Sequence, residues 1–401
     1  MLNSTIRNDF FKNKQHAFIW SVLFLSPILG WLSVLVLGFA GLSQLRFWRE
    51  IKFSFQNRSV LIAGAIILLY LITLFTFGRV HEFGLKALKF PAGLLVPFGL
   101  LVWFNKKNLS ENVVSTSAVY AVIVISMLMG LEWLVYKFYF GVDARVRGLS
   151  ANPLFVSAML LPLQLLAIHN FKQATRAFKK IILLSWFMGL ICLAMFLGAR
   201  SSFMIMLGLS FISFFLQTEG YKNRLKFIFT IVILVSLLGV FSYYQAENIS
   251  FFARMKILLD FMLTFDMSQV QDVSIKPRWS AWQAAWQAIV QQPWLGYGFA
   301  QERVALAQYL PQGALVLPTS HQEYLSFMLG AGVFGLISGV LYLLFPLLAI
   351  GLSNPKRRLA LCLVAPFLLN AFTDTLLDDL RIIFYYTTIG LLLISVKVQR
   401  E

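Results

Sequence analysis

The chain has 401 residues, of which 59% are hydrophobic, 15% aromatic and only 13% charged. This composition excludes an ordinary soluble domain and predicts that lipid is the solvent for much of the surface. The formal net charge of +17 arises from 34 Lys and Arg against 17 Asp and Glu. Because no basic soluble domain with interleaved aromatic residues carries this charge, we expect membrane lipids as partners, and no nucleic acid.

Apolar stretches with the length of a membrane-spanning helix recur along the chain. They cover approximately residues 17–42, 59–78, 87–104, 114–136, 153–168, 181–198, 201–217, 227–243, 324–349, 359–373 and 382–396. Pro27 and Gly30 interrupt the first stretch, which forms either one tilted span or a hairpin of two short helices. The basic N-terminus, with Arg7, Lys12 and Lys14, would lie in the cytoplasm with the other basic segments if the stretch is a hairpin, which favours the hairpin. The sequence therefore predicts an all-α polytopic membrane protein of about twelve spans, with about eleven as the alternative.

Alternate loops are rich in Lys and Arg, which places those loops in the cytoplasm. The basic loops lie near residues 46–58, 106–107, 172–180, 222–226 and 356–358. The intervening loops then face outward, at residues 79–86, 137–152, 198–201, 244–321 and 374–381. Chemistry on the outer side is expected in these segments.

Three regions of one integrated domain follow from this topology. Residues 1–243 form an N-terminal transmembrane bundle, residues 244–321 a large outer loop, and residues 322–401 the C-terminal transmembrane helices. A loop of such length inside a helical bundle is usually functional. Helical periodicity at 249–268, and again around the tryptophans near Trp282, predicts two short helices in it, the second ending at Pro293.

Lys and Arg are enriched in cytoplasmic loops, so cationic residues predicted on the outer side need a separate explanation. Arg200 lies in a tight turn between two apolar stretches, and Arg278 follows Pro277 at the start of the Trp-rich helix. Each guanidinium either snorkels to the membrane interface or binds an anion, since its planar fork matches phosphate oxygens.

His321 precedes the stretch that returns the large loop to the membrane. Ser320-x-x-Glu323 has the spacing of a capping box, which predicts Ser320 as N-cap and His321 as the first helical residue. An imidazole there either is a solvated interface residue or takes a proton from a hydroxyl group. The other histidines are scattered and both cysteines lie in apolar stretches, so neither a metal site nor a cofactor is expected.

Four groups of residues resemble the O-antigen ligase family. They are Arg147-Gly148 with Asn152-Pro153; Gly198-Ala-Arg200; Arg278-x-x-x-Trp282 leading to Pro293-x-x-Gly296-x-Gly298; and Ser320-His321-x-x-Tyr324-Leu325 before Gly330 and Gly335. The resemblance is strongest over residues 145–340, and the large loop before the histidine fits it. Leu154 departs from the polar residue that many relatives have after the proline.

The resemblance implies a GT-C type glycosyltransferase, independent of metal and ATP, in the bacterial inner membrane with its active site facing the periplasm. The implied donor is O-antigen linked to undecaprenyl diphosphate, and the implied acceptor is the lipid A-core oligosaccharide. By position, Arg200 and Arg278 would bind the diphosphate and His321 would be the essential histidine. His321 would then deprotonate the attacking hydroxyl, and a single displacement would invert the anomeric centre.

Further candidates for substrate binding are Lys86, Lys89, Arg145, Arg147 and Trp282, for each of which anchoring at the interface is the alternative. Asp374 in the last outer loop either orients a cation or the histidine, or is simply solvated.

Other functions remain open at this stage. An O-antigen polymerase would use the same donor, but neither Arg278 nor Arg303 has the glycine spacing of its paired repeats. A protein O-oligosaccharyltransferase would usually be longer. A flippase or transporter would account for the helices and cations, although the halves show no self-similarity.

Overall fold

We describe the protein from a computed structural model. It describes residues 21–29, 31–44, 58–77, 93, 97–100, 110–140, 146, 152–226, 229, 275–298, 301–312, 314–351 and 353–396. Within these ranges the regular elements are all helices, which confirms the expected all-α class. The predicted span 87–104 lies mostly outside the described residues, the span 227–243 almost entirely so, and the predicted helix at 249–268 wholly so.

The helices before the large loop follow the predicted apolar stretches closely. They are α3 (Ser26–Leu29), α4 (Trp31–Gln44), α6 (Arg58–Phe77), α8 (Glu111–Tyr139), α9 (Pro153–His169), α10 (Arg176–Ile191), the π-helix η4 (Cys192–Phe196) and α11 (Arg200–Gln217). The first apolar stretch contains two described helices, since α3 ends at Leu29 and α4 begins at Trp31.

The remaining described helices belong to the large loop and the C-terminal region. They are α14 (Ile275–Gln291), α15 (Glu302–Tyr309), α16 (Glu323–Ile350), α17 (Arg357–Asn370) and α18 (Leu380–Ser395). The Trp-rich helix predicted in the loop is therefore present as α14, and it ends before Pro293 as expected.

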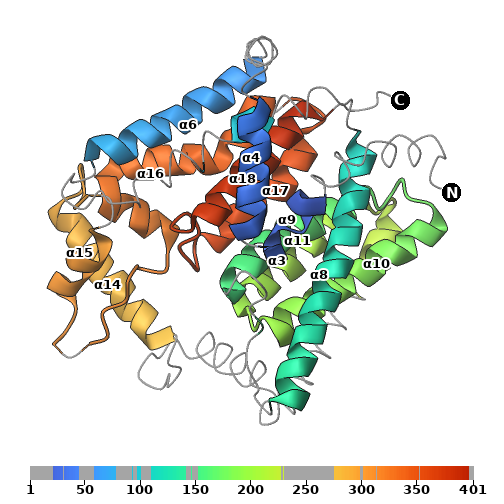
Figure 1. Cartoon of the computed structure of the whole chain (residues 1–401), viewed down its shortest axis with the longest axis horizontal. Helices are drawn as coiled ribbons and strands as arrows, with labels where there is room; N and C mark the ends of the chain where they lie inside the picture. Colours follow the sequence, from blue (N-terminus) through green and yellow to red (C-terminus); the bar gives the residue numbers. More distant parts are fainter. Residues whose placement is uncertain are drawn as a thin grey trace.

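Helix α9 lies at the centre of the bundle. Its residues from Phe155 to Ile168 are all buried, and α3, α8, α10, α11, α17 and α18 contact it. A helix that is apolar all round has no face suited to water, so burial on every side is its stable placement. Figure 1 shows α9 between α8 and α10 on one side of the molecule and α14 and α15 on the other.

The outer helices expose apolar side chains, which is expected where lipid is the solvent. Leu131 and Phe138 of α8 are 57% and 78% exposed, and Phe187 of α10 and Leu61 of α6 are also exposed. Four described segments have the length and composition of membrane spans: Glu111–Tyr139, Arg176–Phe196, Arg200–Gln217 and Glu323–Ile350. The protein is therefore a helical membrane protein.

Helix α16 is broken where the large loop meets it, a feature that the sequence analysis did not predict. Ala331 and Gly332 have non-helical backbone angles, which frees carbonyl groups in the preceding turn. The segment after α14 supplies the missing donors: the N–H of Tyr297 donates to the carbonyl of Leu329 (2.7 Å), and the N–H of Gly298 donates to that of Gly330 (3.1 Å). The Pro293–Gly298 turn thus anchors α14 and α15 to the bundle.

Replacement of Gly332 by alanine should disrupt this junction. Gly332 has a φ of +60°, and an added Cβ would lie 2.2 Å from the backbone carbonyl carbon of Trp294. We expect Gly332→Ala to cost at least about 2 kcal/mol in thermal unfolding of the detergent-solubilised protein. Gly208→Ala in α11 is the matched control, because its added Cβ would meet nothing within 4 Å. Equal melting temperatures for the two variants would contradict the described junction.

Candidate active site

His321 lies in a turn ahead of α16, not within the helix. The predicted capping box is wrong: the N-cap is Gln322, whose Oε1 accepts a hydrogen bond from the N–H of Leu325 (2.7 Å). His321 has a φ of +53°, the left-handed conformation that non-glycine residues rarely adopt. The helix starts later than predicted because the Glu323 carboxylate bonds to another loop and is not available to cap this end.

Two helices of the large loop hold the turn through the backbone of Ser320. The N–H of Ser320 donates to Glu302 Oε1 of α15 (2.6 Å), and its carbonyl accepts from Trp282 Nε1 of α14 (2.9 Å). The hydroxyl of Ser326 also donates to Glu302 Oε1 (2.8 Å). Burial raises the pKa of the Glu302 carboxyl, and these hydrogen bonds act in the opposite direction. Trp282 therefore has a structural partner here, in addition to its predicted contact with substrate.

Asp374 faces the His321 ring from the loop between α17 and α18. His321 Nδ1 lies 3.1 Å from Asp374 Oδ1, and the two side chains are 24% and 12% exposed. A carboxylate at this distance favours the tautomer in which Nδ1 donates, which leaves Nε2 free to accept a proton. The pair therefore has the geometry of a general base and the group that orients it.

Glu323 fixes the Asp374 loop to the start of α16. Its buried Oε2 accepts hydrogen bonds from the N–H groups of Leu376 and Leu377, the latter at 3.0 Å. The Glu323 N–H in turn donates to the carbonyl of Ala371 (2.8 Å). His321 and Asp374 are thus on segments that are bonded to each other.

Arg278 brings α14 against the same loop. Its Nη1 donates to the carbonyl of Thr373 (3.1 Å), the residue before Asp374. Three of the predicted site residues, Arg278, His321 and Asp374, therefore gather around one loop, although long stretches of sequence separate them.

A cavity of about 370 Å³ opens beside the imidazole, and we call it the His321 cavity. Asn152, Phe155, His321, Asp374 and Arg381 are among its lining residues. Asn152 also caps α9, since its Oδ1 accepts from the N–H of Leu154 (3.0 Å).

Arg381 is a lining residue that the sequence analysis missed. Its side chain is 8% exposed, pairs with Asp379 and lies 4.3 Å from the centre of the Phe155 ring. A guanidinium so deeply buried beside a cavity is a candidate anion ligand. The available signal was the Asp379-x-Arg381 pair at the outer end of an apolar stretch.

Arg200 occupies a different place from the other predicted residues. It is the first residue of α11, after Gly198 with its φ of +58°, and it is not among the described residues that line the His321 cavity. Val146 reaches the same junction, where its N–H donates to the carbonyl of Phe196 (3.0 Å). Predicted residues Lys86, Lys89, Arg145 and Arg147 lie outside the described residues.

Metal ligands do not gather in the part of the chain that the structure describes, since no three His, Cys, Asp or Glu side chains are grouped there as a metal site requires.

Removal of the Glu323 carboxylate should destabilise the protein, because this group holds the Asp374 loop against the start of α16. Glu323→Ala leaves two backbone N–H groups without their acceptor, so we expect a loss of about 2–5 kcal/mol in thermal unfolding. Glu323→Gln keeps one acceptor oxygen and should lose clearly less. If the alanine variant unfolds like the wild type, Glu323 does not hold the Asp374 loop.

Comparison with known proteins identifies the region that contains much of this site. Residues 183–340 match the model of the O-antigen ligase family. A comparison with curated proteins found no match to the chain. The matched stretch includes Arg200, Arg278, Trp282 and His321, whereas Asp374 and Arg381 follow it in the chain. The resemblance drawn from the sequence motifs is thereby confirmed over this stretch, which holds three of the four motif groups; the group at Arg147 and Asn152 precedes it.

Proposed function

We propose that the protein is an O-antigen ligase of the bacterial inner membrane with its active site facing the periplasm. The domain match supports a membrane enzyme of the O-antigen ligase or polymerase type. The finer proposal is that it transfers O-antigen from undecaprenyl diphosphate to the lipid A-core oligosaccharide. The observation that carries it is the His321–Asp374 pair beside a cavity with a buried arginine, within and just after the matched domain.

In this mechanism His321 Nε2 takes the proton of the acceptor hydroxyl while Asp374 stabilises the imidazolium that forms. The hydroxyl oxygen attacks the anomeric carbon, the bond to the diphosphate breaks, and the configuration inverts. The departing diphosphate gains negative charge, which Arg200 and Arg278 are proposed to offset. Arg381 is a further cation beside His321 for the same purpose. Because the donor already carries a good leaving group, neither ATP nor a metal ion is required by the proposal.

The alternatives differ in what accepts the sugar. A polymerase would transfer one lipid-linked chain to another, a protein O-oligosaccharyltransferase would glycosylate a protein, and a flippase would move the lipid-linked chain without reaction.

The decisive experiment is transfer by purified protein in detergent, with lipid-linked O-antigen, lipid A-core acceptor and EDTA, and without nucleotide. We expect O-antigen-capped lipopolysaccharide as the product, resolved as a ladder on a gel. Lengthening of the donor with the acceptor untouched would identify a polymerase instead. No reaction with either substrate would contradict both and favour transport.

Variants of the proposed site should separate the roles of its residues. His321→Ala and Arg200→Ala should each lower kcat by at least about 10²-fold while the protein remains folded. Asp374→Asn should lower kcat less, because the imidazole remains although its charge is no longer stabilised. Arg224→Ala, beyond the opposite end of α11 from Arg200, is the control and should keep full activity. Normal transfer by the His321 or Arg200 variant at native expression would contradict these assignments.

A further inference from the structure

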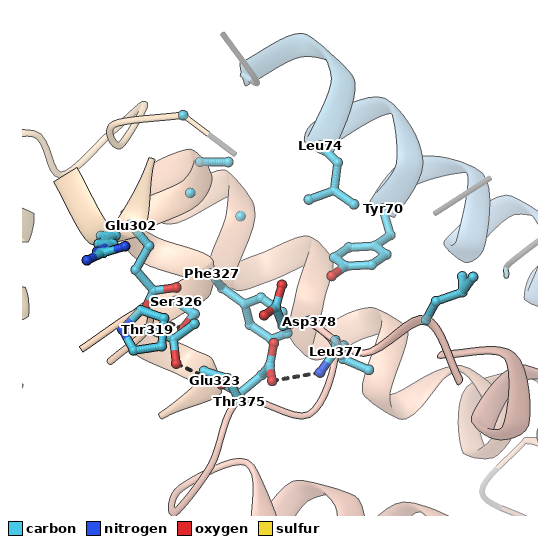
Figure 2. A pocket seen from close by; sticks show the side chains of 17 residues that line it. Tyr70, Leu74, Glu302, Thr319, Glu323, Ser326, Phe327, Thr375, Leu377 and Asp378 are labelled. Carbon is cyan, nitrogen blue, oxygen red and sulfur yellow. Dashed lines mark hydrogen bonds between the residues drawn. The ribbon is translucent and has the colours of Figure 1, made fainter. Parts of the chain in front are cut away.

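A second cavity, of about 400 Å³, adjoins the His321 cavity, and we call it the Tyr70 cavity (Figure 2). It lies between α6, α15, α16 and the Asp374 loop. The two cavities share wall residues, namely Pro318, Thr319, Thr375, Asp378 and Leu380. A molecule in the Tyr70 cavity would therefore be separated from the His321 site only by these two short segments.

The charged groups of the Tyr70 cavity are mainly acidic. Glu302, Glu323 and Asp378 line it, together with a single cation, Arg303, among the described lining residues. In the described part of the chain, the hydrogen bonds to Glu302 go to Oε1 and those to Glu323 go to Oε2, so each carboxylate keeps a second oxygen as acceptor. Such a lining disfavours phosphate and favours a ligand that donates several hydroxyl hydrogens.

Tyr70 independently points to a ligand in this cavity. The residue is 3% exposed and its ring stacks on Tyr342, with ring centroids 4.8 Å apart. Figure 2 shows its hydroxyl directed into the cavity, toward Asp378 and Phe327. A buried tyrosine hydroxyl usually takes part in a hydrogen bond, and one directed into a cavity can form it with a ligand there.

The remaining wall leaves room for a ring. Phe327 contributes an aromatic face, and Gly330 and Gly335 contribute stretches without side chains. A Cβ added at Gly330 would meet no atom within 4 Å, so this part of the wall borders open space. An aromatic ring beside carboxylates suits a sugar, whose C–H face is apolar and whose edge carries hydroxyl groups.

We propose that the Tyr70 cavity binds a neutral sugar residue of one of the two substrates, next to the position where transfer occurs. Glu302, Glu323 and Asp378 accept hydrogen bonds from its hydroxyls, Tyr70 completes the set, and Phe327 packs on the ring face. The inference rests on the proposed transferase function and deepens it. The sugar belongs either to the donor chain or to the acceptor core, and the two sources share this chemistry.

The test uses two variants of the full-length protein in detergent that leave the His321–Asp374 pair untouched. Tyr70→Phe removes only the hydroxyl, and Gly330→Leu fills the cavity from a position with open space. KM and kcat are measured separately for lipid-linked donor and lipid A-core acceptor. We expect Tyr70→Phe to raise one of the two KM values by about threefold to tenfold, with kcat changed by less than about twofold. Gly330→Leu should raise the same KM by at least about tenfold.

The matched control is Tyr385→Phe, because it removes the hydroxyl of another buried tyrosine, one that does not line the Tyr70 cavity. It should leave both KM values unchanged. A raised donor KM assigns the sugar to the donor, and a raised acceptor KM assigns it to the acceptor. An active wild type whose Tyr70 and Gly330 variants retain both KM values would overturn this inference alone. A wild type that transfers nothing would overturn the proposed function and this inference with it.

Discussion

The break in α16 is the constraint on which the candidate site depends. A helix interrupted within a candidate membrane span must have its freed carbonyl groups satisfied, and here the Pro293–Gly298 turn does so from outside the helix. The close approach requires Gly332, whose missing side chain admits the backbone of Trp294. Because the turn joins α14 and α15, its docking delivers Trp282 and Glu302 to the backbone of Ser320. The position of His321 thus follows from a backbone junction some distance along the chain.

Carboxylates near the site have distinct physical roles, although their chemistry is the same. Glu302 and Glu323 accept backbone N–H groups and fix the segments that carry His321 and Asp374. Asp374 faces the imidazole and sets its tautomer, while Asp379 pairs with Arg381. Holding the segments rigidly is what keeps a base within reach of a substrate hydroxyl, since small displacements of a reacting group cost large factors in rate. The acidic Tyr70 cavity and the cationic groups near His321 would then sort neutral sugar from anionic diphosphate.

Much of the fold was accessible from the sequence because lipid imposes a simple rule on apolar stretches. The described helices α6, α8, α9, α11, α17 and α18 coincide with predicted stretches within a few residues, and α14 coincides with the Trp-rich helix. The predicted capping box at Ser320 is wrong because a local sequence pattern contains no information on distant partners. Glu323 instead accepts hydrogen bonds from Leu376 and Leu377 on another loop. Arg381 was not predicted as a site residue for a related reason: in the sequence it only marks the end of an apolar stretch, and its place beside His321 depends on the tertiary structure.

The sequence by itself determined that the protein is a helical membrane protein and that it resembles the O-antigen ligase family, because hydropathy and short motifs are local properties of the chain. Only the tertiary structure decided which of the candidate residues meet. It placed Arg278 and Asp374 at one loop beside His321, gave Ser320 its partners, and put Arg200 at the start of α11. These positions depend on hydrogen bonds between segments that are far apart in the sequence, and residue spacing along the chain does not predict such bonds.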